Sequence, residues 1–161
     1  MTTSTETRAS ETAAVHSTFR LEREYAASPA RVFRAFAESE AKRRWFVEGE
    51  GWEVFEYTAD FRVGGREYSR FSFQGGPAIE NETLFLDIVP DERLIFAYRI
   101  AAEGAPMSAS LTTIELIPQG NGTLLVQTEQ GAYLDGSDDG TNREAGWRGL
   151  LERLAGEVEE A

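Results

Sequence analysis

The feature that most constrains this fold is the end of the chain, residues 141–161, which has the spacing of one amphipathic helix. Apolar side chains recur at helical intervals there, at Trp147, Leu150, Leu151, Leu154 and Val158. The other face is polar and carries Arg148, Glu152, Arg153, Glu157, Glu159 and Glu160. Because the apolar stripe has to be buried, the preceding strands are expected to form a curved sheet wrapped over the helix. A terminal helix docked on a sheet for stability alone would explain the same stripe.

The long middle of the chain is typical of strands and turns, with no helix of any length. Six strands are predicted, at residues 53–59, 66–74, 79–89, 93–100, 110–117 and 123–130. Parallel strands would need crossover helices, so hairpin spacing without such helices predicts an antiparallel meander. Residues 131–140 are rich in Gly and Asp and are predicted to be a polar loop that leads to the last helix.

The N-terminal part is predicted to contain a tail, a strand and two short helices. Residues 1–13 lack periodicity and are expected to be a disordered tail, which leaves 14–161 as a single domain. Residues 15–25 alternate between apolar and polar side chains and predict a half-buried strand, with His16 on its polar face. A helix is expected to begin at Ser28-Pro29, and a second one, capped by Ser39, is expected to follow.

Composition excludes several classes of function. The chain has 16 basic and 28 acidic residues and a formal charge of −12, which argues against nucleic-acid binding. It contains no cysteine and a single histidine, so no metal site and no cofactor are expected. No segment is apolar enough to span a membrane, and the N-terminus lacks the pattern of a signal peptide. We therefore expect a cytoplasmic location and no membrane insertion.

The order of the predicted elements resembles the α+β helix-grip fold of the SRPBCC superfamily, to which the START domains belong. Four motifs are similar to homologues of the activator of heat-shock protein 90 ATPase: Ser28 to Phe36 followed by Trp45, Phe61 to Gly65, Val89 to Leu94, and Gly146-Trp147 with Leu150, Leu151 and Leu154. Residues 128–136 further resemble bacterial members described as polyketide-cyclase-like. The resemblance implies a curved antiparallel sheet of about seven strands wrapped on the C-terminal helix, enclosing an apolar cavity.

Binding of a small hydrophobic molecule in that cavity is the preferred function. Candidate lining residues are Trp45, Phe71, Phe73, Phe85, Phe96, Tyr98, Trp147, Leu151 and Leu154. Such pockets are mostly apolar, with a few polar groups that fix the orientation of the ligand. Plain core packing is the alternative for each of these side chains taken singly.

Two other functions stay open. A cyclase- or hydrolase-type enzyme would need a buried ionisable group, and Glu129 is a weak candidate because burial beside an aromatic ring would raise its pKa. Tyr98 and Arg70 are the other two candidates for such a group, and no nucleophile–base pair is evident. The resemblance also implies a chaperone-interaction module, although about a dozen residues stand here in place of the eukaryotic activator's N-terminal chaperone-binding domain. A homodimer is left open alongside a monomer.

Overall fold

A curved antiparallel sheet forms most of the structure, a computed structural model that describes residues 12–159. Its seven strands lie in the order β1-β7-β6-β5-β4-β3-β2. They are β1 (Val15–Tyr25), β2 (Trp52–Ala59), β3 (Arg66–Phe73), β4 (Ile79–Val89), β5 (Arg93–Ala102), β6 (Ala105–Gln119) and β7 (Gly122–Tyr133). The predicted tail lies almost wholly outside the described residues, as do the last two residues of the chain.

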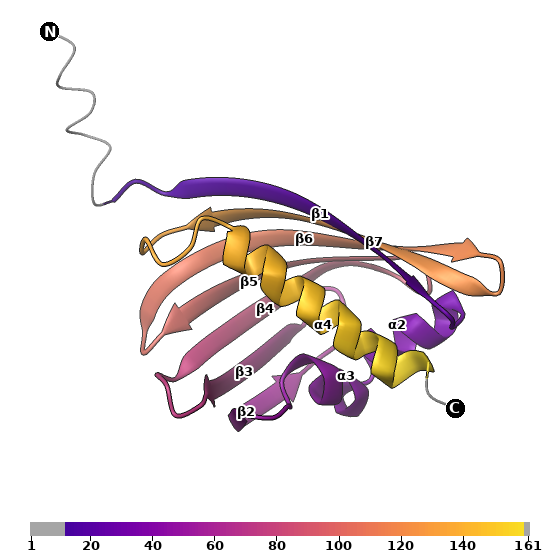
Figure 1. The fold of residues 1–161 in the computed structure, drawn as a ribbon, viewed down its shortest axis with the longest axis horizontal. Coiled ribbons are helices and arrows are strands. Elements are labelled where there is room, and N and C mark those ends of the chain that lie inside the picture. The colour runs from indigo at the N-terminus through magenta and orange to yellow at the C-terminus, as the bar shows by residue number, and fades with distance from the viewer. Residues whose placement is uncertain (1–11, 160–161) are drawn as a thin grey trace, which may run out of the picture.

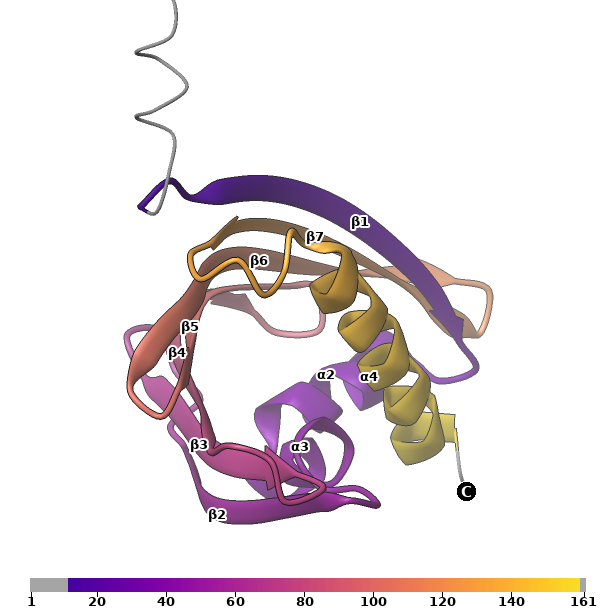
Figure 2. The same ribbon diagram turned by 60° about the vertical axis from the view of Figure 1, so that its left-hand side comes forward.

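Three helices lie on the concave side of this sheet (Figure 1). They are α2 (Pro29–Ala37), α3 (Ser39–Phe46) and α4 (Thr141–Glu159). Figure 2 shows the sheet curling from β1 above α4 round to β2 beneath α3. Register shifts in β2, at Val54/Glu56, and in β4, at Phe85/Asp87, are bulges of the kind that add curvature. The predicted α+β helix-grip fold is therefore confirmed.

The two short helices follow one another with one residue between them. Ser28 caps α2, since its Oγ accepts the backbone N–H of Arg31 at 3.2 Å, and Pro29 is the first helical residue, as predicted. The predicted cap of α3 is wrong: Ser39 is the first residue of that helix and Glu38 holds the N-cap position. The backbone of Glu38 makes hydrogen bonds to both helices. Its N–H donates to the carbonyl of Arg34 at the end of α2, and its carbonyl accepts the N–H of Lys42 in the first turn of α3.

The last two strands are longer than the sequence predicts. Strand β6 begins at Ala105, and β7 continues to Tyr133, into the segment predicted to be a loop. Tyr133 pairs with Val15 of β1 on one side and with Ser108 of β6 on the other. Because β7 has a neighbour along both edges, its backbone groups stay paired where the local sequence favours a turn.

The apolar stripe of α4 is buried as predicted. Trp147, Leu151, Leu154, Ala155 and Val158 are all buried, and they join aromatic and aliphatic side chains of α2, α3 and the sheet in one core. The hydroxyl of Tyr25 in β1 donates to the carbonyl of Leu151 at 2.8 Å. The helix is thus held by apolar burial and by a buried polar contact to the first strand.

We expect Leu154→Ala to lower the free energy of unfolding by about 2–5 kcal/mol, because its side chain is fully buried and the cavity left behind would not close. Leu150→Ala is the matched control, since Leu150 lies one turn earlier on α4 and is only partly buried. Chemical denaturation of both variants measures the difference. A midpoint unchanged by Leu154→Ala would show that α4 is not gripped by the sheet.

Candidate functional site

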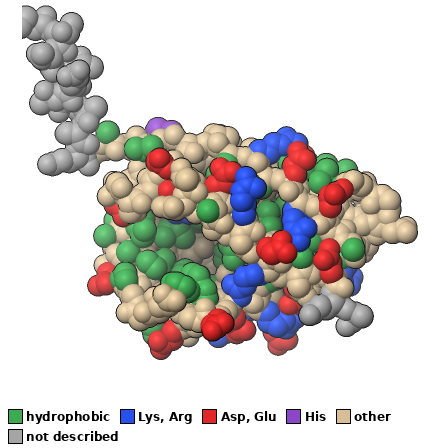
Figure 3. Space-filling view, in the orientation of Figure 1, with side chains coloured by type: hydrophobic (Ala, Val, Ile, Leu, Met, Phe, Trp, Pro, Cys, Tyr) green, Lys and Arg blue, Asp and Glu red, His purple; other side chains and the backbone are tan. Residues whose placement is uncertain are grey.

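A cavity of about 580 Å³ lies between α4 and the concave face of the sheet. Figure 3 shows hydrophobic side chains gathered around a hollow beside α4. The lining residues are Phe46, Val47, Trp52, Phe71, Asn81, Tyr98, Ile100, Met107, Tyr133, Ser137, Asp138, Asn142, Arg143, Gly146, Trp147, Gly149, Leu150 and Arg153. Most of these side chains are apolar, and the charged ones come from α4 and the loop before it.

The structure brings only three of the predicted lining residues to the cavity, namely Phe71, Tyr98 and Trp147. The others lie outside its lining. Trp45, Phe85, Phe96, Leu151 and Leu154 are buried in the core, and Phe73 is 44% exposed beside Trp52. The physical reason is that the five buried side chains belong to one core, in which helix and strand side chains pack against one another and leave no space for a ligand.

Several lining residues escape prediction because local sequence signals place them elsewhere. Tyr133 falls in the predicted loop, and Trp52 begins the edge strand β2. Arg153 belongs to the face of α4 predicted to be polar, yet it lines the cavity together with Leu150. The spacing of Arg143, Leu150 and Arg153, at seven and three residues, is a helical signal that could have identified this second face.

Glu129 of β7 is fully buried and contacts Tyr98, a residue that lines the cavity. Its Oε2 accepts the hydroxyl of Tyr98 at 2.6 Å, and its Oε1 accepts the hydroxyl of Thr112 at 2.8 Å. Period-two alternation places all three side chains on the same face of neighbouring strands. The guanidinium of Arg143 lies 4.0 Å away and supplies the nearest positive charge. Glu129 is therefore part of a buried polar network and does not itself line the cavity.

The hydroxyl of Tyr98 is the centre of this network. It donates to Glu129 and accepts two hydrogen bonds at 3.1 Å, from Nη1 of Arg143 and from Nε1 of Trp147. A phenolic hydroxyl has one proton and two lone pairs, so all of its hydrogen-bonding capacity is used. The network thereby fixes the N-terminal half of α4 to strand β5.

Burial sets the protonation of this network. It raises the pKa of Glu129 above its ordinary value, while hydrogen bonds from Tyr98 and Thr112 and the charge of Arg143 oppose that rise. Burial also raises the pKa of Tyr98, and the neighbouring charge of Glu129 raises it further. Tyr98 therefore stays protonated at neutral pH and remains a hydrogen-bond donor to the carboxyl group.

Arg143 and Asp138 complete the polar end of the cavity. Arg143 donates through Nη2 to the hydroxyl of Ser108 at 2.7 Å, and its guanidinium lies 5.4 Å from the ring centroids of both Tyr98 and Tyr133. The carboxylate of Asp138 accepts backbone N–H groups at the start of α4, including that of Arg143 at 2.9 Å. These contacts satisfy groups that a helix N-terminus would otherwise leave unpaired.

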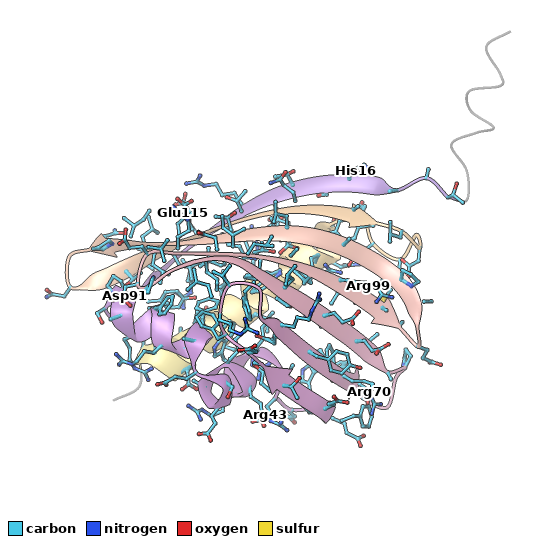
Figure 4. All side chains as sticks on the ribbon, turned by 180° about the vertical axis from the view of Figure 1, so that it is seen from behind. His16, Arg43, Arg70, Asp91, Arg99 and Glu115 are labelled. Atoms are coloured by element: carbon cyan, nitrogen blue, oxygen red, sulfur yellow. The ribbon has the colours of Figure 1, made fainter. Side chains whose placement is uncertain are left out.

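Arg70, the third candidate for an ionisable group, and His16, the single histidine, both lie outside the lining of the cavity. Figure 4 shows both on the side of the sheet turned away from α4, where the guanidinium of Arg70 packs 4.9 Å from the ring of Phe55. The structure therefore does not join Arg70 to Glu129. Residues 12–159 contain no cluster of three or more metal-ligating side chains, and no helix among them is long and apolar enough to cross a membrane.

Comparison with known proteins assigns the family. Residues 26–159 match the model of a family described as activator of Hsp90 ATPase homolog 1-like protein. The chain belongs to this family. A search of curated proteins finds no match to the chain.

Solved structures of bacterial proteins share the fold of this activator-homologue family member. Protein Mll3558 from Rhizobium loti is 55% identical, with a TM-score of 0.84 over 91% of this chain and 99% of its own. A protein from Rhizobium leguminosarum is 38% identical, with a TM-score of 0.87 over 91% of this chain and 97% of its own. CalU16 from Micromonospora echinospora, at 22% identity and a TM-score of 0.61 over 92% of this chain and 85% of its own, is similar in fold.

Because the carboxyl group of Glu129 is buried, we expect the free energy of unfolding of the protein to depend on pH. Because the pKa of Glu129 is higher in the folded than in the unfolded chain, its contribution to stability is full below the ordinary value of 4.5 and is lost as pH rises through the folded value. The stability of wild type relative to Glu129→Gln should therefore fall with rising pH, by about 1.4 kcal/mol per unit of raised pKa. Denaturation from about pH 4 to 8 measures it.

Glu115→Gln is the control for this experiment, since Glu115 is exposed on the outer face of the neighbouring strand β6 (Figure 4). A difference between wild type and Glu129→Gln that stays constant over the whole pH series would contradict the assignment. It would mean that the carboxyl has the same proton affinity in the folded and the unfolded chain.

Proposed function

We propose that the protein binds a small, mainly apolar molecule in the cavity between α4 and the sheet. The observation that carries this proposal is the cavity itself, about 580 Å³ in volume and lined by Phe46, Ile100, Met107 and Leu150 as well as tryptophan and tyrosine rings. This volume lies within the usual range for small-molecule sites, roughly 300–1,000 Å³. The SRPBCC fold, which this chain shares, commonly holds hydrophobic ligands.

The shape of α4 supports this proposal. Gly146 and Gly149 line the cavity, and a Cβ added at either position would meet no atom within 4 Å. Glycine is unfavourable inside a helix, by about 1 kcal/mol relative to alanine. Two glycines on one wall of the cavity therefore leave space that larger side chains would take up, at a cost in helix stability.

Binding is favoured over catalysis by the state of Glu129 and Tyr98. Both carboxylate oxygens of Glu129 accept hydroxyl hydrogen bonds, and Tyr98, which separates it from the cavity, has its hydrogen-bonding capacity filled. A general acid or base has to reach the substrate within hydrogen-bond distance or through one water molecule. Catalysis at Glu129 would first require these contacts to break, whereas binding uses the cavity as it stands.

We expect the neutral dye N-phenylnaphthylamine to bind with micromolar affinity, on the order of −8 kcal/mol. Gly149→Leu places a side chain in the cavity and should lower the affinity for the dye by at least about tenfold. Gly156→Leu is the matched control, because Gly156 is exposed on the same helix, lies outside the cavity lining and has equally open surroundings. Fluorescence titration measures the affinities.

Thermal denaturation of both leucine variants accompanies the titration. Each should be as stable as wild type or more stable, because leucine is a better helix former than glycine. Absence of saturable binding to wild type, or equal loss in both variants, would overturn the proposal.

A further inference from the structure

The charge of the cavity wall is opposite to that of the whole chain. The chain carries a formal charge of −12, yet the cavity is lined by two arginines, Arg143 and Arg153, and by one acidic residue, Asp138. The carboxylate of Asp138 is taken up by backbone N–H groups at the start of α4, where the helix dipole compensates its charge. The wall therefore presents net positive charge to whatever occupies the cavity.

The two arginines differ in what they already bind. Arg143 donates to Tyr98 and Ser108 and lies 4.0 Å from the carboxylate of Glu129, so its charge is compensated inside the protein. Arg153 makes one side-chain hydrogen bond, from Nη2 to the carbonyl of Arg44 at 3.0 Å. It forms no ion pair with any residue of the described range 12–159.

Two arginines close to Arg153 do have carboxylate partners, so Arg153 differs from both of them. Arg44 pairs with Glu157 at 2.7 Å, and Arg148, on the same helix as Arg153, pairs with Glu144 at 2.8 Å. Burial lowers the pKa of Arg153, while the more distant charge of Glu48 partly opposes that shift. A partly desolvated guanidinium without a carboxylate is costly to maintain, and an anion bound beside it would remove that cost.

Local geometry places this guanidinium beside the apolar wall. A Cβ added at Gly49 would lie 3.1 Å from Nη2 of Arg153 and 3.0 Å from Cδ1 of Trp52, so both side chains border the space beside that glycine. Arg143 and Arg153 are ten residues apart on α4, which corresponds to about 15 Å along a helix. Apolar groups, including Leu150, lie between them.

We propose that the ligand is a small organic acid whose apolar body fills the cavity and whose anionic group, a carboxylate or sulfonate, is held by Arg153. This inference rests on the proposed function, because it names the chemical class of the molecule bound in the same cavity. The guanidinium presents planar donors that match the oxygen atoms of such an anion.

The test compares two dyes that share one skeleton. Anilinonaphthalene sulfonate carries the N-phenylnaphthylamine skeleton with one added sulfonate, so only the anionic group differs. Arg153→Gln should lower the affinity for the sulfonate dye by about tenfold. The affinity for the neutral dye should stay the same within about twofold. Arg148→Gln is the matched control, since it removes the same charge from an exposed position of α4 that lies outside the cavity lining. Both affinities should be unchanged in that control.

A salt titration of wild type keeps the test independent of how well the variant folds. Sodium chloride at about 0.5 M should lower the affinity for the sulfonate dye more than the affinity for the neutral dye, because salt screens the charge of Arg153. Failure of both dyes to bind wild type would overturn the proposed function. Binding of the neutral dye with equal effects of Arg153→Gln on both dyes, or with equal effects of salt, would overturn the assignment of an anionic ligand and leave the cavity function standing.

Discussion

The attachment of α4 to the sheet is the interaction on which the rest of the structure depends. Near its N-terminus, Trp147 and Arg143 both donate to the hydroxyl of Tyr98. Further along, Leu154 is fully buried and the carbonyl of Leu151 accepts the hydroxyl of Tyr25. These contacts hold the helix over the concave face of the curved sheet (Figure 2), where residues of the helix between Asn142 and Arg153 line the cavity.

Polar groups keep that cavity from closing. Tyr98 and Arg143 line the cavity and belong with Glu129 to one hydrogen-bonded network, so replacing one member would leave a buried partner unsatisfied. The apolar wall alone would favour collapse, since a void in a core lowers stability in proportion to its volume. The network resists collapse because Arg143 and Tyr98 are held by hydrogen bonds whose distances would have to change. Glu129, which the sequence suggests as a candidate acid or base, thus holds the side chain of Tyr98 in place through a hydrogen bond.

Sequence patterns predict the architecture better than the site. The stripe Trp147, Leu151, Leu154 and the alternation of β1 identify buried faces, because burial imposes the period of the element on the sequence. The same signal cannot separate Phe71, which lines the cavity, from Phe85, which is buried in the core, since both are apolar and face inward. That difference depends on the distance between helix and sheet, which long-range packing sets.

Arg153 shows the same limit for a charged residue. Helical spacing places it at the border between the polar and apolar faces of α4, and a charged side chain at such a border is usually solvated. In the structure the side chain donates to the carbonyl of Arg44 in α3, and together with Trp52 of β2 it borders the space beside Gly49. The surroundings of its guanidinium, which offer no ion pair within residues 12–159, arise from segments distant in sequence, in a chain with an excess of acidic residues. A cavity arginine without a carboxylate partner attracts anions at that point, against the repulsion that the chain's formal charge of −12 exerts on them.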